Sequence, residues 1–177
     1  KDNKERLKEL KAINSVSQII ARGKPIDDTL LEICSILPKS WQYPRHTAAR
    51  VKYMGKEFVT KNFKETPWSQ KENFITFDNK KGSIEIFYLK EFPKSYEGPF
   101  LKEERSLLIN ISKLTSGYIN DYKGREIYRA TELGANQVAR PTAYRDSLVK
   151  NKRPLQLFFN QKAIDKYIYL DMMKYKV

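Results

Sequence analysis

The sequence predicts an α+β domain in which an antiparallel sheet is covered by helices from its N- and C-terminal parts. Apolar residues recur at spacings of three and four in residues 3–37 and again in residues 102–122, as in amphipathic helices. In residues 46–89 the spacing changes to two, which is typical of half-buried strands. A short turn joins the two strands of each expected pair, so we expect two antiparallel hairpins.

The first expected helix covers residues 3–22 and ends at Gly23 and Pro25. One apolar stripe runs between its charged residues, and it consists of Leu7, Leu10, Ile13, Val16 and Ile20. Such a helix can pack on its own domain or pair with a partner helix as a coiled coil. Five apolar positions do not separate these two possibilities.

The second expected helix covers residues 27–37, and Pro38 ends it. Asp27 or Asp28 can cap it by accepting free amide protons of the first turn. Cys34 falls on its apolar face and is expected to be a core residue rather than a reactive thiol. A single cysteine excludes a disulfide framework, argues against a thiolate zinc site, and fits a reducing, cytoplasmic setting.

The sheet is expected to contain four strands and a crossover. Ala49, Val51 and Tyr53 alternate with cations in the first strand, and Ile84, Ile86 and Tyr88 share one face of the last. The four strands are expected at residues 46–54, 57–60, 74–77 and 83–89, with an irregular crossover at 61–73 and turns at Gly55 and 78–82.

The helical spacing returns in residues 102–122, where Leu107, Ile111, Leu114 and Tyr118 form one stripe. Two glutamates occupy its first turn, where carboxylates favour the positive end of a helix. Because the sheet must cover its apolar face, we expect the first and last helices to lie near each other on one side of it.

The composition predicts one globular domain with a small appendage. The chain has 177 residues, of which 40% are hydrophobic, and it contains no apolar run long enough to span a membrane. The formal net charge is +13, which permits nucleic acid, an anionic membrane surface or an acidic partner, or simply a solvated basic surface. The chain begins with Lys1, which suggests a piece of a larger protein.

We expect the domain to cover residues 1–122 and a basic, mainly helical extension, or the start of a second module, to cover 123–177. Its helical segments are expected at 125–133, 142–149 and 163–173, with a short strand at 153–159. Cations such as Arg153 lie close in sequence to aromatics such as Phe158. Such mixtures suit nucleic-acid surfaces, so a nucleic-acid-binding module is the alternative function, although a solvated face explains the same residues.

The segment 37–105 resembles a GAF-like sensor domain of bacterial and archaeal signal-transduction proteins, often found ahead of PAS or histidine-kinase modules. The resemblance extends to residues 3–122 with the flanking helices. It rests on these pieces in order: Leu37-Pro38, Trp41-Gln42-Tyr43-Pro44, Ala49-Arg50, Gly55, Phe58, Thr60, Phe63, Glu65-Thr66, Trp68, Gly82, Glu85, Tyr88-Leu89, and Glu97-Gly98-Pro99-Phe100-Leu101-Lys102-Glu103-Glu104-Arg105.

The resemblance implies a GAF/PAS-like sheet, a non-catalytic sensory input role, and an output domain elsewhere in the parent chain, such as the kinase of a two-component system. It also implies dimerisation through the terminal helices, and the candidate residues are Leu7, Leu10, Ile13, Ile111, Leu114 and Tyr118. It names no ligand or cofactor.

Four residues are candidates for a small-ligand site: Tyr43, Arg50, Trp68 and Tyr88. Tyr43 belongs to an aromatic element that either packs the end of the sheet or forms a pocket wall. Trp68 lies where the resemblance places a cavity, which it either lines or fills. Arg50 points to solvent, reaches an acidic ligand, or forms a salt bridge with Glu85, and the salt bridge is favoured.

The sequence gives little support for catalysis. His46 is the single histidine, and it has no evident partner for a nucleophilic site. Phosphate-binding glycine loops, paired cysteines and a zinc-protease motif are missing from the sequence. The segment 97–105 is dense in charge, but its residues are expected to shape the start of the last helix.

Overall fold

The computed structural model describes residues 2–138, and within them the fold is α+β. The chain divides into two compact units, Lys1–Lys123 and Gly124–Val177. The elements expected at 142–149, 153–159 and 163–173 lie outside the described residues. The described elements are α1 (Asp2–Ala21), α2 (Ile26–Ile36), η1 (Leu37–Ser40), η2 (Pro44–His46), β1 (Thr47–Tyr53), β2 (Lys56–Val59), β3 (Ser69–Ile75), β4 (Lys81–Tyr88) and α3 (Lys102–Val138).

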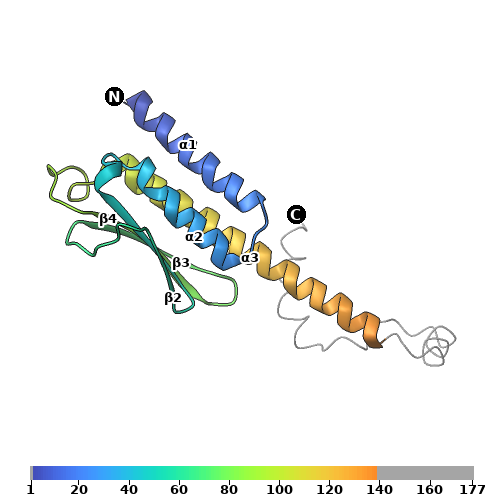
Figure 1. Ribbon diagram of the computed structural model, residues 1–177. Helices are drawn as coiled ribbons and strands as arrows, with labels where there is room; N and C mark the ends of the chain where they lie inside the picture. The colour runs from blue at the N-terminus through green and yellow to red at the C-terminus, as the bar shows by residue number, and fades with distance from the viewer. Residues whose placement is uncertain (1, 139–177) are drawn as a thin grey trace. The chain divides into compact units, whose positions relative to one another are not determined.

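The four strands form one antiparallel sheet in the order β2-β1-β4-β3 (Figure 1). The central pair is β1 and β4, in which Arg50 lies opposite Glu85 and Val51 opposite Ile84. Since side chains alternate along a strand, the first pair belongs to one face and the second to the other. The predicted antiparallel sheet is therefore confirmed, with β2 and β3 at its edges.

One face of the sheet is apolar and lies under helices, and we call it the covered face. Its central residues are fully buried: Ala49, Val51, Ile84, Ile86 and Tyr88. Helix α2 and the first part of α3 lie across this face (Figure 1). The opposite face carries Arg50, Lys52, Lys71 and Glu85 in the register of the strands, and we call it the open face.

Helix α1 lies beside α2 and α3 on the side away from the sheet (Figure 1). It buries Ala12, Val16 and Ile19 in the common core. The Asn110 side-chain amide on α3 donates a hydrogen bond to Glu9 Oε1 on α1, at 3.4 Å. The first and last helices thus lie together on one side of the sheet, as predicted, but α2 is the N-terminal helix that touches the strands.

Strand β3 begins earlier than the sequence predicts. It covers Ser69–Ile75 rather than 74–77. Its first residues are polar, which an edge strand with exposed positions along one side can accommodate. The following turn covers residues 76–80, closed by the Thr76 amide donating to the Lys80 carbonyl at 3.0 Å. Gly82 is already in β4, where a Cβ would lie 2.3 Å from the Phe74 ring.

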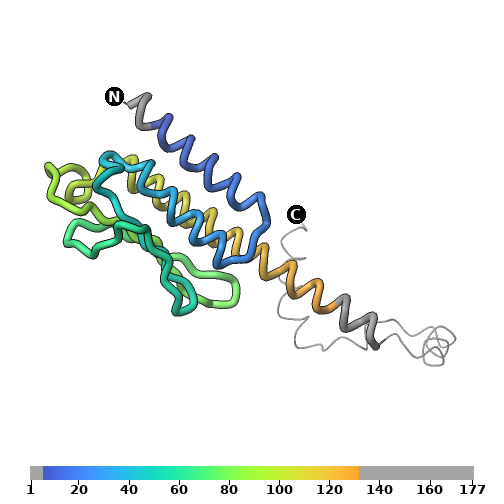
Figure 2. Tube along the Cα trace, viewed as in Figure 1, coloured from blue at the N-terminus to red at the C-terminus, as the bar shows by residue number. Residues whose placement is uncertain are grey.

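Two helix ends also differ from the expectation. Helix α2 has Pro25 at its N-cap without a side-chain cap, so Asp27 and Asp28 lie in the first turn instead. Helix α3 does not end near residue 122 but continues to Val138, so it includes the segment expected as a separate helix at 125–133. Figure 2 shows the helix running on past residue 122. Among the helices in the described range, none has both the length and the hydropathy of a membrane span.

Candidate functional site

The structure separates the four predicted ligand residues between the two faces of the sheet. Tyr88 lies on the covered face, and the ring of Tyr43 meets its edge with centroids 5.4 Å apart. Trp68 is half-buried against the same core, and its carbonyl accepts the Tyr88 amide at 2.9 Å. Arg50 lies on the open face, so it cannot share one pocket with the aromatic residues.

The aromatic residues on the covered face pack against one another. Tyr43 stacks on Phe92 with ring centroids 3.6 Å apart, and Tyr88 stacks on Phe100 at 4.3 Å. Tyr88 and Phe100 are fully buried. Burial, together with the neighbouring Glu104 carboxylate, raises the pKa of Tyr88. These contacts fill the end of the core, which agrees with the first of the two alternatives for Tyr43, packing at the end of the sheet.

Glu104 organises the start of α3. Its carboxylate accepts hydrogen bonds from the Tyr88 hydroxyl at 2.8 Å and from the backbone amides of Gln42 and Leu101, both at 2.7 Å. The bond to Leu101 is half of a capping box. Arg105 donates to Glu97 Oε2 at 2.6 Å. The charged segment 97–105 therefore fixes the beginning of the helix, as the sequence indicated.

Arg50 is the centre of a charge network on the open face. Its Nε donates to Glu85 Oε2 at 2.7 Å, which confirms the predicted salt bridge, and its Nη2 reaches Glu65 Oε1 at 2.7 Å. The guanidinium also lies over the Phe63 and Phe87 rings, 5.1 and 5.4 Å from their centroids. Arg50 is 8% exposed and Glu85 is 5% exposed, so this ion pair is shielded from water.

The pKa of Glu85 shows which effect dominates there. Burial alone would raise the pKa of this carboxyl, because it disfavours the charged form. The hydrogen bonds and positive charge of Arg50 oppose burial, with help from Lys71 and Ser83, and the pKa is lowered below 4.5. Glu85 is therefore a structural anion held by its partners.

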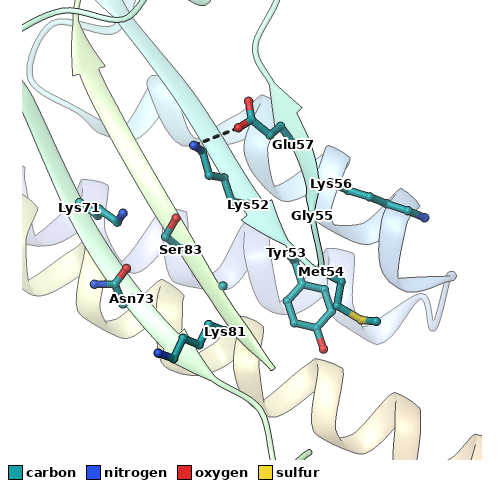
Figure 3. A pocket seen from close by; sticks show the side chains of 11 residues that line it. Lys52, Tyr53, Met54, Gly55, Lys56, Glu57, Lys71, Asn73, Lys81 and Ser83 are labelled. Atoms are coloured by element: carbon teal, nitrogen blue, oxygen red, sulfur yellow. Dashed lines mark ion pairs between the residues drawn. The ribbon is translucent and has the colours of Figure 1, made fainter. Parts of the chain in front are cut away.

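A hollow of about 290 Å³ opens beside this network, near the β1–β2 turn (Figure 3). It is lined by Lys52, Tyr53, Met54, Gly55, Lys56, Glu57, Lys71, Asn73, Lys81, Gly82 and Ser83. We call it the lysine hollow. Lys52 pairs with Glu57 at 2.9 Å, and Lys71 reaches Glu85 Oε1 at 3.3 Å.

The lysine hollow is not predicted by the pattern of residues along the chain. Only part of it has a signal in the sequence, because Lys52 alternates with Val51 and Tyr53, whereas Lys71 lies in the segment expected to be an irregular crossover. Only the register of the strands shows that these lysines share one face of the sheet. Lys52 of β1 and Asn73 of β3 both lie opposite Ser83 of β4, and Lys71 lies two residues from Asn73, on the same side of β3. Strand pairing over long sequence separations thus creates this cluster.

The predicted dimer residues divide into buried and exposed groups. Ile111 and Tyr118 are buried in the core of their own chain, while Ile13 and Leu114 are half-buried against it. The Tyr118 hydroxyl donates to the Lys24 carbonyl and accepts from Thr29 Oγ1 at 3.0 Å. The other two residues, Leu7 and Leu10 of α1, are 52% and 64% exposed.

Cys34 and His46 show no arrangement for nucleophilic chemistry. Burial raises the pKa of the Cys34 thiol to about 12, and its Sγ lies 3.4 Å from the Ala49 carbonyl. His46 ends η2 one residue before β1, rather than beginning the strand, and its ring lies 5.9 Å from Phe92. Within the described residues, no cluster of three or more His, Cys, Asp or Glu side chains could hold a metal.

Comparison with protein-family models and with curated proteins finds no match for this chain.

Proposed function

We propose that this chain is a non-catalytic sensory or regulatory input domain of the GAF-like kind, which self-associates through α1 and passes its state to an output domain through α3. The observation that carries the proposal is the course of α3. This helix is part of the domain core at Leu107, Leu108 and Ile111, and it continues without a break to Val138. A helix that is fixed in a core at one end can carry a change of packing along its axis.

Contacts between α1 and α3 support this role. Ala12, Val16 and Ile19 of α1 share the core with α3, and Asn110 bonds Glu9. The Tyr118 hydroxyl ties α3 to the Lys24 carbonyl in the segment between α1 and α2. A change in how α1 is packed therefore has a direct physical route to α3, which is what a two-state input element requires.

Self-association is argued from the outward side of α1. Leu7 and Leu10 are more than half exposed, although the inward side of the same helix is buried. Exposed leucines three residues apart lie on one helix face and fit a second copy of the same helix. The proposed dimer interface therefore consists of Leu7 and Leu10. It does not include Ile111 and Tyr118, because these two residues are buried in the core of their own chain.

Analytical ultracentrifugation of the full chain tests the proposal. We expect a concentration-dependent dimer that the double variant Leu7→Glu/Leu10→Glu abolishes, because each charge would be buried without a partner at the interface. Leu31→Glu on α2 is the matched control, since Leu31 is 50% exposed, and it should leave the dimer intact. A wild-type monomer at every concentration, or a dimer that survives the double variant, would overturn self-association through α1.

A further inference from the structure

We propose that the lysine hollow on the open face docks an acidic segment of a partner protein. The proposal is independent of self-association, because α1 lies on the other side of the molecule from the open face (Figure 1). Three features of the open face support it: the positive charge of the hollow, its open shape with an apolar rim, and the packing of the aromatic residues of this face against Arg50.

The hollow carries more positive than negative charge. Lys52, Lys71 and Lys81 project from three adjacent strands around it, whereas Glu57 is the one acidic residue of the lining (Figure 3). Lys81 forms no ion pair with another described residue. The Lys71 side chain is 53% exposed even though it reaches Glu85. A carboxylate arriving from outside would therefore meet ammonium groups that still have unused donors.

The floor and rim of the hollow fit a protein segment rather than a small molecule. Ser83 and Asn73 form a polar floor, and the hollow is open to solvent. Pockets for small ligands instead enclose them among mostly apolar side chains. Met54 and Ile75, at this end of the sheet, are 56% and 60% exposed. Apolar residues beside charged ones are the composition of a protein–protein interface.

The aromatic residues of the open face argue against nucleic acid as the occupant. Sheets that bind single strands present exposed aromatic rings on which bases stack. Here Phe87 is 4% exposed, and Phe87 and Phe63 both lie against the Arg50 guanidinium. The face thus offers cations and hydrogen-bond donors but no stacking platform, which favours carboxylates on a polypeptide.

Fluorescence polarisation with a labelled peptide of alternating Glu and Ala tests the proposal on the full chain. Each exposed lysine contact contributes about 0.5 kcal/mol, so Lys71→Gln/Lys81→Gln should weaken binding about 5-fold. The control Lys11→Gln/Lys113→Gln removes the same charge from exposed positions on α1 and α3, and it should weaken binding less than about 2-fold. Equal losses in the two variants would overturn the proposal.

Chemical-shift mapping on the unsubstituted protein gives a readout that does not depend on a variant folding. The peptide should shift the backbone amides of Lys52, Asn73 and Ser83 and leave those of α1 unchanged. Shifts confined to α1 or to residues 139–177 would overturn the site. A competition experiment tests the occupant. If single-stranded oligonucleotide or anionic vesicles shift the same amides at a lower concentration than the peptide needs and displace it, an acidic protein segment is not the occupant of the hollow.

Discussion

The two faces of the sheet use the same strands in opposite ways. On the covered face, side chains such as Ile84, Ile86 and Tyr88 are fully buried beneath helices. On the open face, the intervening residues form ion pairs with one another, and the Arg50 guanidinium pairs with Glu85 and Glu65 and lies over the Phe63 ring. A period of two along β1 and β4 therefore separates an apolar core from a charge network.

This difference shows where a binding function can reside. The covered face is occupied by ring stacking and by bonds that fix the start of α3, so its aromatic residues act in stability. The open face retains exposed lysines and a hollow. The predicted ligand residues belong mainly to the first face, and the proposed docking site belongs to the second.

The largest effect is expected on the covered face. Ile86→Ala should lower the free energy of unfolding by about 3 kcal/mol, because it removes buried methyl groups and leaves a cavity in the core. Asn73→Ala, at an exposed position of the open face, should change it by less than about 0.5 kcal/mol. Urea denaturation followed by circular dichroism measures both values. Similar losses in the two variants would contradict the distinction between the faces.

A smaller loss is expected from the charge network. Arg50→Ala should lower the free energy of unfolding by about 2 kcal/mol, because it leaves the buried Glu85 carboxylate with only Lys71 and Ser83 as partners. The double variant Arg50→Met/Glu85→Leu should recover part of this loss, since no unpaired charge remains. A double variant less stable than Arg50→Ala would show that the pair is worth more than an apolar replacement.

The smallest effect is expected in the pH dependence of stability. The pKa of Glu85 is lowered in the folded state, so its contribution is present above the ordinary value of 4.5 and is lost as the pH falls through the folded pKa. Glu85→Gln should therefore flatten the acid limb of stability against pH, measured by thermal unfolding. Glu97, which Arg105 holds with a lowered pKa, should keep part of that slope. An unchanged slope would contradict the role assigned to Glu85.

Periodicity predicted the helices and the central strands because their side chains are sorted by burial along the chain itself. Residues 3–22 and 27–37 correspond closely to α1 and α2, and residues 46–54 and 83–89 to β1 and β4. Edge strand β3 was placed too late because Ser69–Asn73 are polar and show no apolar alternation. Their strand conformation comes from pairing with β4, which residue patterns in β3 alone do not encode.

The candidate site depended far more on tertiary structure. The Arg50–Glu85 pair was predictable, since both residues are charged and lie at alternating positions of adjacent strands. The cluster of Lys52, Lys71 and Lys81 was not predictable. These lysines come from three different strands, and local residue patterns do not show the order of the strands in the sheet. Likewise, the stripe with Ile111 and Tyr118 would be apolar whether it faced a partner or its own core. The sequence could therefore not tell a dimer interface from core packing there.

The sequence by itself determined the α+β class, the positions of α1 and α2, the start of α3, the antiparallel hairpins and the salt bridge of Arg50, because each follows from the spacing of apolar and charged residues. The tertiary structure alone decided which apolar stripes remain exposed and which cations share a face. Those properties depend on strand order and helix packing, which bring together residues that are distant in the chain. Among the described residues, Leu7 and Leu10 on α1 and the lysine hollow on the sheet are two of the surfaces that this packing leaves open.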